Sequence, residues 1–357
     1  IKGLNLIDYG FIPSMLYSLN TPQDEVSGIP ARVTAVYKER YELICESGQA
    51  FGRLKTGVYY AKGRESFPTT GDFVMISFNQ SGDSQIIKTL PRKSFFSRRD
   101  PAPGRGEQAV AANFDYVFIM QSLNFDFNPK RMERYITLAW QSGAMPVLIL
   151  TKADLVEDFT EQMRAAEKVA SGIGIYAVSA MSGVGIDALT DYLKPRKTIV
   201  FLGSSGVGKS SLVNALAGSD IMAVNEIRED DSKGRHTTTH RQLIMLDSGV
   251  MIIDTPGMRE LGMWDVSQGL GEAFGDVEQY FGKCKFKDCR HQTEPDCAVK
   301  AAIENGELPP DRWNSYLNLK REAKFSDDKG AYLRQKQQWH KELAKWSKQK
   351  KKNGGKQ

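Results

Sequence analysis

The sequence predicts a multidomain protein in which a small β-barrel precedes an α/β domain with a mostly parallel sheet and a mostly helical C-terminal region. Three observations predict this architecture. The 357 residues exceed what one hydrophobic core normally serves. Short strand candidates fill residues 30–92, and strands alternate with helices from Asp115 onward. From Gly271 onward the pattern turns helical around a cluster of cysteines and a histidine.

The composition is that of a globular protein, with 41% hydrophobic and 25% charged residues. Four cysteines in a chain of this length do not indicate a disulfide scaffold. The longest apolar runs, such as residues 147–150, are far too short to span a bilayer. The first residues show no secretory signal pattern. We therefore expect a cytoplasmic monomer with no membrane contact.

The net charge of +5 is unevenly distributed along the chain. Residues 334–357 hold nine lysines and arginines and one acidic residue, Glu342, whereas the rest of the chain is slightly acidic. A basic terminal segment indicates an anionic partner, usually nucleic acid. The alternative is a helix whose charged face is only solvated.

The first 92 residues divide into an extension, residues 1–29, and a strand-rich region, residues 30–92. Turn residues separate five strand candidates in that region, at 32–37, 41–45, 50–54, 72–77 and 85–88. Five short strands in succession predict a small closed barrel, of which the OB-fold is one type. OB-folds often bind RNA or DNA, although a barrel alone does not establish that use.

Residues 91–113 are rich in proline, glycine and basic residues, which predicts a linker or a mobile basic loop. Within them, residues 94–99 mix aromatic and basic side chains. This mixture suits RNA contact, and the alternative is a strand end that packs onto the barrel.

Alternating elements then predict an α/β domain over residues 93–270. The strand candidates are residues 115–120, 146–150, 175–178, 198–202, 242–246 and 250–254. The helix candidates are residues 128–143, 158–171, 185–193 and 211–218. Asn128 and Pro129 have the types expected at a helix N-cap and first turn, and Gly143 ends that helix. We expect a metal-binding domain over residues 271–323 and a basic helical tail over residues 324–357.

The stretch from Gly203 to Ser211 fits the phosphate-binding P-loop pattern between a strand and a helix. Its glycines let backbone N–H groups converge on phosphate oxygens at a helix N-terminus. Lys209 is expected to reach the β- and γ-phosphates, and the Ser210 hydroxyl to ligate Mg²⁺. The predicted phosphate-binding residues are Gly203, Ser204, Ser205, Gly206, Val207, Gly208, Lys209, Ser210 and Ser211. The alternative is a flexible Gly/Ser loop.

Two further segments fit the partners that a P-loop needs. Asp254 and Gly257 form Asp-x-x-Gly at a strand end, where Asp254 can hold the Mg²⁺ shell and the Gly257 N–H can meet the γ-phosphate. Residues 234–240 precede this strand and contain three threonines. A threonine that ligates Mg²⁺ only while the γ-phosphate is present would make the segment a switch loop. We assign Thr238, with Thr237 and Thr239 as alternatives.

The base-binding motif lies upstream of the P-loop, at Thr151-Lys152-Ala153-Asp154. Asp154 can accept two hydrogen bonds from guanine, whereas adenine offers no such pair of donors. The Lys152 stem would cover the base, and the backbone N–H groups of Ser179 and Ala180 could meet guanine O6. In most GTPases the base motifs follow the phosphate motifs. The reversed order predicts a circularly permuted GTPase. Such a permutation is physically tolerable, because the loops still gather at the C-terminal edge of the same sheet.

A metal site is predicted from Cys284-x4-Cys289-x-His291-x5-Cys297. Three thiolates and one imidazole match a closed tetrahedral Zn²⁺ site, which is typical of a structural role. The alternative is a set of unrelated core cysteines near a surface histidine.

Together the barrel, the permuted motif order, the cysteine–histidine spacing and the basic tail resemble the RsgA family, also called YjeQ. The resemblance implies GTP hydrolysis stimulated by the small ribosomal subunit, a role in late maturation of that subunit, and rRNA contacts by the barrel and the zinc domain. The sequence departs from the family pattern at Thr151, where Asn is commoner, and in a longer N-terminal extension.

The catalytic assignment is the least determined by sequence. Met258 stands where many GTPases carry a glutamine that positions water, and a thioether cannot orient water. We assign His236 of the switch segment to this task, with rRNA contact or simple exposure as alternatives. A different reading is an RNA-binding scaffold whose nucleotide site binds GTP but barely hydrolyses it.

Overall fold

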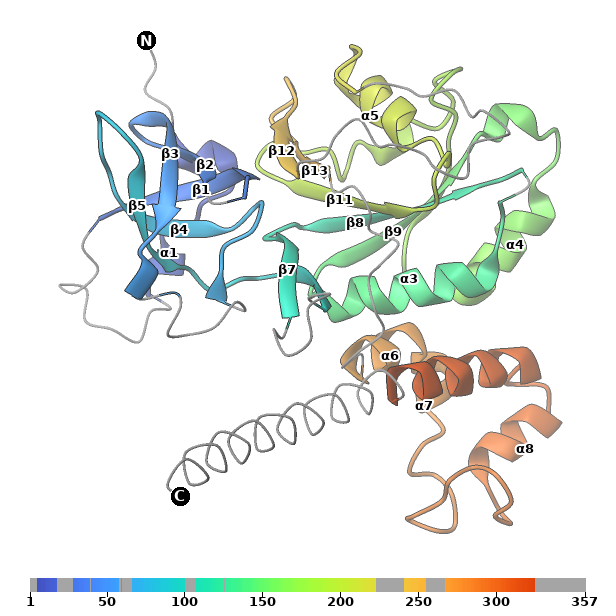
Figure 1. Ribbon diagram of the computed structural model, residues 1–357. Helices are drawn as coiled ribbons and strands as arrows, with labels where there is room; N and C mark the ends of the chain where they lie inside the picture. The colour runs from blue at the N-terminus through green and yellow to red at the C-terminus, as the bar shows by residue number, and fades with distance from the viewer. Residues whose placement is uncertain are drawn as a thin grey trace, which may run out of the picture. The chain divides into compact units, whose positions relative to one another are not determined.

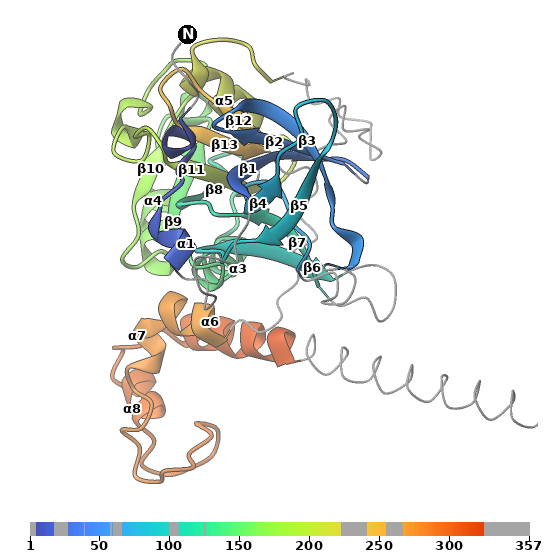
Figure 2. The same cartoon turned by 90° about the vertical axis from the view of Figure 1, so that its left-hand side faces the viewer.

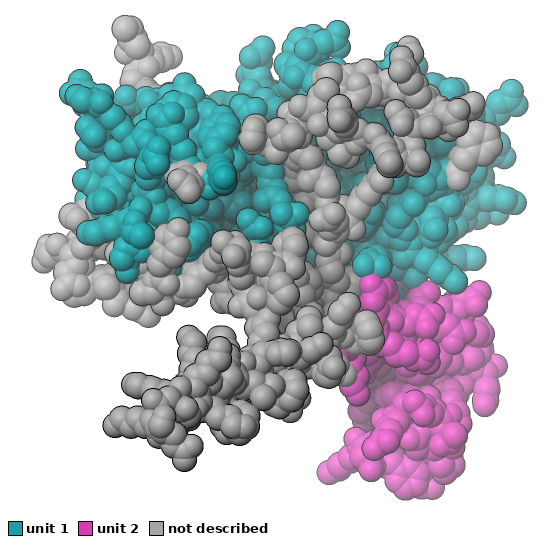
Figure 3. All heavy atoms as spheres, viewed as in Figure 1, with its two compact units in different colours: residues 1–98, 108–261, 267–275 teal, residues 99–107, 262–266, 276–357 magenta. Residues whose placement is uncertain are grey.

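The computed structural model describes residues 5–17, 28–38, 40–57, 59, 66–99, 107–124, 126–222, 241–254 and 267–324. The chain divides into two compact units (Figure 3): residues 1–98, 108–261 and 267–275 form the first, and residues 99–107, 262–266 and 276–357 form the second. Within the described ranges, no helix has both the length and the apolar character that a bilayer crossing requires.

Five strands of the first unit form a closed barrel. They are β1 (Ile29–Val36), β2 (Tyr41–Cys45), β3 (Gly48–Leu54), β4 (Phe73–Ser77) and β5 (Ser84–Thr89). The order is β1-β2-β3-β5-β4, and an antiparallel β1–β4 pair closes the ring. Val33, Leu43 and Ile86 are among the side chains fully buried inside it. The predicted closed barrel is confirmed, and its OB-fold assignment stays a prediction.

The N-terminal extension packs onto this barrel over residues 5–17, as a short 3-10 helix η1 (Leu6–Tyr9) and a helical turn α1 (Ser14–Tyr17). Leu6 and Phe11 are buried against barrel residues, and the Phe11 ring lies 5.6 Å from that of Phe73. The extension therefore adds an outer apolar layer to the barrel.

The α/β part of the first unit is a six-stranded region of sheet. Its strands are β8 (Tyr116–Ser122), β9 (Met145–Thr151), β10 (Ile175–Ala177), β11 (Thr198–Gly203), β12 (Gln242–Met245) and β13 (Met251–Asp254). Their order is β10-β9-β8-β11-β13-β12, and only the β12–β13 pair is antiparallel. Helix α5 (Lys209–Ala217) covers one face, and α3 (Pro129–Gln141) and α4 (Thr160–Val169) cover the other (Figure 1). The mostly parallel, two-sided sheet is confirmed.

Helix α3 begins and ends as predicted. The Asn128 side chain accepts a hydrogen bond from the Arg131 N–H at 3.1 Å, Pro129 is the first helical residue, and Gly143 has a φ of 86°. Helix α6 (Ser267–Ala273) packs on α3 so closely that a Cβ at Gly269 would lie 2.3 Å from the Thr137 carbonyl oxygen. The chain thus returns to the α3 face of the sheet after residues 255–266.

Two expectations for local structure are wrong. The linker or mobile loop expected over residues 91–113 is wrong for the described residues 95–99 and 107–112, because β6 (Phe95–Arg99) and β7 (Glu107–Ala112) form a two-stranded sheet. Buried Phe96 stacks on Phe114 at 4.9 Å, so alternate residues of the segment have an apolar surface to pack on. The helix expected at residues 185–193 is only a 3-10 turn, Asp187–Leu189 (η5). Gly185, with a φ of 74°, and Pro195 leave too little chain for a stable helix.

The barrel and the α/β sheet are one continuous sheet of 11 strands, because β1 pairs with β12 at Ala35 and Gln242 (Figure 2). The Thr70 hydroxyl donates to the Arg241 carbonyl at 3.2 Å beside this pair. Two regions that the sequence presents as separate domains therefore share backbone hydrogen bonds.

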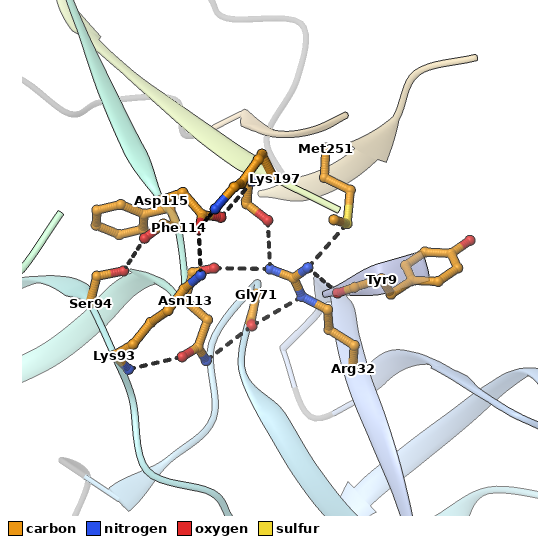
Figure 4. A network of polar contacts seen from close by, with 11 residues as sticks. Tyr9, Arg32, Gly71, Lys93, Ser94, Asn113, Phe114, Asp115, Lys197 and Met251 are labelled. Atoms are coloured by element: carbon orange, nitrogen blue, oxygen red, sulfur yellow. Dashed lines mark hydrogen bonds and ion pairs between the residues drawn. The ribbon is translucent and has the colours of Figure 1, made fainter. Parts of the chain in front are cut away.

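Arg32 of β1 joins the same two regions from inside (Figure 4). Its side chain is buried, and burial lowers its pKa to about 10. Its guanidinium donates to groups from the extension, the barrel and the α/β sheet: the carbonyls of Tyr9, Gly71 (3.3 Å) and Asn113 (3.2 Å), the hydroxyl of Thr198 (3.0 Å) and the sulfur of Met251 (3.0 Å). These acceptors satisfy the hydrogen-bonding capacity of the buried guanidinium, and they attach the barrel to the α/β sheet.

The second unit is mostly helical where it is described, as predicted. The elements of this region are α7 (Gly275–Glu278), α8 (Ala298–Glu304) and helical residues 310–324. Arg312 pairs with Asp276 at 2.9 Å, and the Tyr316 hydroxyl donates to Glu278 at 2.9 Å. These contacts hold residues 310–324 against residues 276–278.

Candidate nucleotide and metal sites

The predicted P-loop connects the end of β11 at Gly203 to the start of α5 at Lys209. Gly206 and Gly208 have φ values of 73° and 97°, in a region that side chains disfavour. Gly203 lies against β8, where an added Cβ would be 3.0 Å from the Met120 carbonyl oxygen. The loop therefore needs its glycines, and it ends at a helix N-terminus suited to an anion.

Lys209 and Asp254, predicted for phosphate and Mg²⁺, lie next to each other. Lys209 Nζ and Asp254 Oδ1 are 2.6 Å apart, because β13 is the parallel neighbour of β11. The Lys209 side chain is 31% exposed, whereas that of Asp254 is 7% exposed. A phosphate could therefore reach the ammonium group of Lys209. A bound Mg²⁺ would then replace Lys209 as the positive partner of the Asp254 carboxylate.

The base motif begins with Thr151, which is buried at the end of β9. Its hydroxyl lies 2.6 Å from the Val207 carbonyl of the P-loop and 3.3 Å from the Gln121 carbonyl of β8. Thr151 thus fastens the base loop to the phosphate loop, although a threonine offers no side-chain amide to a base.

The residues that follow Thr151 make a sharp turn. Lys152 has a φ of 62°, and Asp154 lies on a 3-10 turn, Ala153–Leu155 (η4). The Ala153 N–H donates to the Val178 carbonyl at 3.2 Å, which ties this loop to the one after β10. The Ser179 N–H already donates to the Val184 carbonyl at 2.9 Å. Of the two predicted backbone donors to guanine O6, Ser179 is therefore engaged within its own loop.

All of these loops follow the C-terminal ends of parallel strands, β9, β10, β11 and β13. They gather at one edge of the sheet even though the base motif comes first in the chain. His236, Thr237, Thr238, Thr239, Gly257 and Met258 lie outside the described residues. Their assignments stay predictions.

The four predicted metal ligands of the second unit converge. The donor atoms of Cys284, Cys289, His291 and Cys297 all lie within 4.8 Å of one another. His291 Nδ1 is 3.4, 3.6 and 3.4 Å from the sulfurs of Cys284, Cys289 and Cys297. A tetrahedral Zn²⁺ with Zn–S bonds of about 2.3 Å separates its ligands by roughly 3.5–3.8 Å. The donor set and its spacing therefore fit zinc.

The surroundings of this cluster favour the ligating forms of two of its members. The His291 ring stacks on Phe281 at 4.8 Å, and burial lowers the His291 pKa, which favours neutral imidazole. Burial raises the pKa of the Cys284 thiol, but hydrogen bonds from the Ala298 N–H and the neighbouring thiols outweigh it, and the net pKa is lowered. A lowered thiol pKa favours the thiolate that binds metal.

Comparison with known proteins agrees with this geometry. The family profile of the RsgA GTPases matches residues 89–264. A curated relative from Listeria monocytogenes, Small ribosomal subunit biogenesis GTPase RsgA 1, is 50% identical over 294 residues, 82% of this chain and 83% of the relative. This chain belongs to the RsgA GTPase family. A relative of the same description from Lactiplantibacillus plantarum, RsgA 2, is 42% identical over 324 residues, 90% of each chain.

Two solved structures are similar to this chain, and one of them is described as a circularly permuted GTPase. YjeQ from Thermotoga maritima is 27% identical, with a TM-score of 0.60 over 82% of this chain and 96% of its own. YloQ, described as a circularly permuted GTPase, is 25% identical, with a TM-score of 0.60 over 86% of this chain and 99% of its own. As an RsgA GTPase, the chain is an enzyme that hydrolyses GTP, and its α/β domain is a circularly permuted GTPase domain.

The RsgA nucleotide edge also contains residues that the motifs do not single out. Asp126, between β8 and α3, accepts a hydrogen bond from the Ser204 hydroxyl of the P-loop, and Gln121 lies directly behind Thr151. One signal could have found them: Gln121 lies at the C-terminal end of the buried strand β8, and Asp126 lies in the loop that follows, at the edge where ligands of such sheets bind.

Proposed function

We propose that this chain hydrolyses GTP during late maturation of the small ribosomal subunit, and that the subunit stimulates hydrolysis. The proposal rests on the convergence of the P-loop, Asp254 and the Thr151–Asp154 loop at one sheet edge. The curated names of the relatives, which describe small ribosomal subunit biogenesis GTPases, support the choice of partner. Its ligands are GTP and GDP, and its partners are the subunit and its rRNA.

The residue roles follow from charge and position. Lys209 neutralises the β- and γ-phosphates, and the amides from Gly203 to Ser211 hold them. Ser210, Asp254 and Thr238 provide the ligands of Mg²⁺, and Gly257 meets the γ-phosphate. At the base, Asp154 reads guanine, Lys152 covers it, and the loop of Ser179 and Ala180 meets O6. A preference for GTP over ATP that disappears in Asp154→Ala would agree with this reading.

His236 acts in catalysis by orienting the attacking water, since Met258 cannot. The test is His236→Ala assayed with purified small subunits. We expect stimulated turnover to fall by about 100-fold or more while GTP affinity stays within a factor of two to three. Normal stimulated turnover would contradict this role.

The Cys₃His cluster holds one structural Zn²⁺ and shapes the second unit. Because structural zinc contributes folding free energy directly, removal by a chelator should unfold residues 276–324 and leave GTP affinity unchanged. Hydrogen exchange resolved by segment measures both effects. Unchanged protection of residues 276–324 after complete zinc loss would contradict the structural role.

The barrel, the zinc-binding unit and the basic tail, residues 324–357, contact rRNA, and the protein acts as a cytoplasmic monomer. Phosphate contacts by the tail should weaken steeply as salt increases. Co-sedimentation with small subunits under GTP analogue, GDP and no nucleotide, combined with phosphate release with and without subunits, tests the proposed function. Binding to subunits without stimulated phosphate release would favour a scaffold instead.

A further inference from the structure

We propose that Asp126 is a positioning residue for GTP binding. It holds the phosphate loop in place through its hydrogen bond with Ser204. This inference rests on the proposed nucleotide site. The Ser204 hydroxyl donates a hydrogen bond to Asp126 Oδ2, although the two residues are 78 positions apart in the chain. Ser204 is the first residue after β11, so the contact holds the P-loop where it leaves the sheet.

Asp126 is itself held in place by the first turn of α3. Arg131 Nη2 lies 2.8 Å from Asp126 Oδ1, and the same guanidinium donates to the Asp126 carbonyl. Arg131 also donates to Gln121 Oε1 at 3.0 Å. The carboxylate therefore has a fixed orientation, and its charge is balanced by Arg131. It consequently does little to repel a phosphate in the neighbouring loop.

Gln121 connects this support to the second support of the P-loop. Its side chain is fully buried, and its Oε1 accepts hydrogen bonds from Arg131 and from the Asn128 N–H at 3.3 Å. Its carbonyl faces the Thr151 hydroxyl, which lies 2.6 Å from the Val207 carbonyl. The P-loop is thus hydrogen-bonded on both sides of Gly206, at Ser204 and at Val207. Both contacts connect to Gln121 of β8, the first through Asp126 and Arg131 and the second through Thr151.

Such fastenings matter because the loop binds phosphate through backbone N–H groups. Gly206 and Gly208 make the required turn accessible, but they also widen the range of conformations available to an unsupported loop. A loop that is ordered before the ligand arrives does not lose that freedom on binding. Asp126 therefore strengthens the binding of GTP and GDP alike, since both use the same amides, and it does not touch the reacting γ-phosphate.

The experiment measures dissociation constants of GTP analogue and GDP, with steady-state kinetics, for Asp126→Ala, Asp126→Asn, Ser204→Ala and the double variant Asp126→Ala/Ser204→Ala. We expect Asp126→Ala to weaken both nucleotides about five- to tenfold and to raise KM by a similar factor, with kcat changed less than about threefold. Asp126→Asn keeps an oxygen acceptor for Ser204 and should recover most of the affinity. Ser204→Ala should match Asp126→Ala, and the double variant should be no weaker than either single variant.

Asp191→Ala is the matched control, because the Asp191 side chain is 89% exposed and pairs with Lys194, at 3.2 Å, on the surface. It should leave both affinities unchanged. A role limited to stability would lower Tm without changing affinity, so thermal unfolding is measured in parallel. Unchanged affinities in Asp126→Ala and Ser204→Ala, or additive losses in the double variant, would overturn the proposal.

Hydrogen exchange of residues 203–208 without nucleotide separates this proposal from the proposed function. We expect faster exchange in Asp126→Ala and Ser204→Ala than in the unmodified chain or Asp191→Ala. Absence of GTP binding by the unmodified chain would overturn the proposed function, whereas equal exchange rates in all four proteins would overturn the role of Asp126.

Discussion

The two ends of the parallel strands in the α/β sheet use charged residues in opposite ways. At the C-terminal ends, Lys209 and Asp254 form an ion pair in which the lysine side chain is 31% exposed. At the N-terminal ends, the guanidinium of Arg32 is buried among partners from three parts of the first unit. In the proposed function, a phosphate replaces Asp254 as the partner of Lys209, and Mg²⁺ replaces Lys209 as the partner of Asp254. The hydrogen bonds of Arg32 are made to groups of the chain itself, most of them buried.

One sheet therefore carries charged groups suited to ligand binding at one edge and charged groups that stabilise the fold at the other. Groups that must bind and release a ligand need access to solvent and a partner that can be exchanged. Polar groups that attach one part of the fold to another contribute most to stability when they are buried and fully hydrogen-bonded. Removing such a group leaves its buried partners without a hydrogen bond. Substitutions at the nucleotide edge should therefore change binding, and those at the opposite edge should change stability.

The largest expected effect is that of Lys209→Ala on turnover. If Lys209 faces the β- and γ-phosphates as proposed, loss of this cation should lower kcat/KM for GTP about 100-fold or more. Phosphate release measures it, with Lys194→Ala, a substitution of a 62% exposed lysine, as the control. Similar kcat/KM values for the two variants would remove the distinction between the edges.

Arg32→Met should lower the free energy of unfolding by about 3 kcal/mol, because several buried carbonyls and one hydroxyl lose their donor. Arg196→Met is the control: Arg196 is 57% exposed and 3.4 Å from Asp8, an exposed pair expected to contribute less than about 0.5 kcal/mol. Denaturant unfolding compares the two. Equal losses of unfolding free energy in the two variants would show that Arg32 does not attach the barrel to the sheet. A loss of GTP binding free energy in Arg32→Met that exceeds its loss of unfolding free energy would show the same.

Thr151→Val should weaken GTP and GDP about fivefold, since the hydroxyl that fastens the base loop to Val207 is lost at constant shape. Thr151→Ser keeps the hydroxyl and should stay within a factor of two. Titration with fluorescent nucleotides measures both. A weak Thr151→Ser variant would mean that the methyl group, and not the hydrogen bond, is what the site needs.

The smallest expected effect concerns Asp115, at the edge opposite the nucleotide. Burial raises its pKa, but Lys93, the Thr198 N–H and Lys197 outweigh burial, and the net pKa is lowered. A carboxyl whose folded pKa is lowered contributes stability above its unfolded pKa of about 3.9, and that contribution is lost as the pH falls through the folded pKa. The contribution should stay below about 1 kcal/mol, since both lysines are about 40% exposed.

Asp115→Asn should therefore be slightly less stable than the unmodified chain at pH 7, and its Tm should fall less steeply below about pH 4. Thermal unfolding between pH 7 and pH 3 measures the two curves, with Asp191→Asn as the control. Parallel curves for Asp115→Asn and the unmodified chain would show that the lysines do not hold this carboxylate.

Several features could be predicted because their causes lie close together in the chain. This holds for the Asn128 cap, the glycines of the P-loop and the cysteine–histidine cluster. Each is formed by residues that lie close together in the sequence. The strands at residues 95–99 and 107–112 do not stand out in the sequence, because prolines and glycines lie before and between them. Phe96 finds its packing partner, Phe114, in the segment between β7 and β8. The supports of the P-loop at Asp126 and Gln121 carry no motif at all.

From the sequence we could predict most of the strands and helices, the permuted order of the nucleotide motifs and the four residues that converge in the second unit. Each of these features depends on residue types at short fixed spacing. Three contacts became visible only in the three-dimensional structure: the pairing of β1 with β12, the hydrogen bond of Thr151 to the P-loop, and the contact of Arg32 with Met251, 219 positions away. Those contacts depend on which strands become neighbours, and strand order follows from packing of the whole sheet rather than from any local pattern.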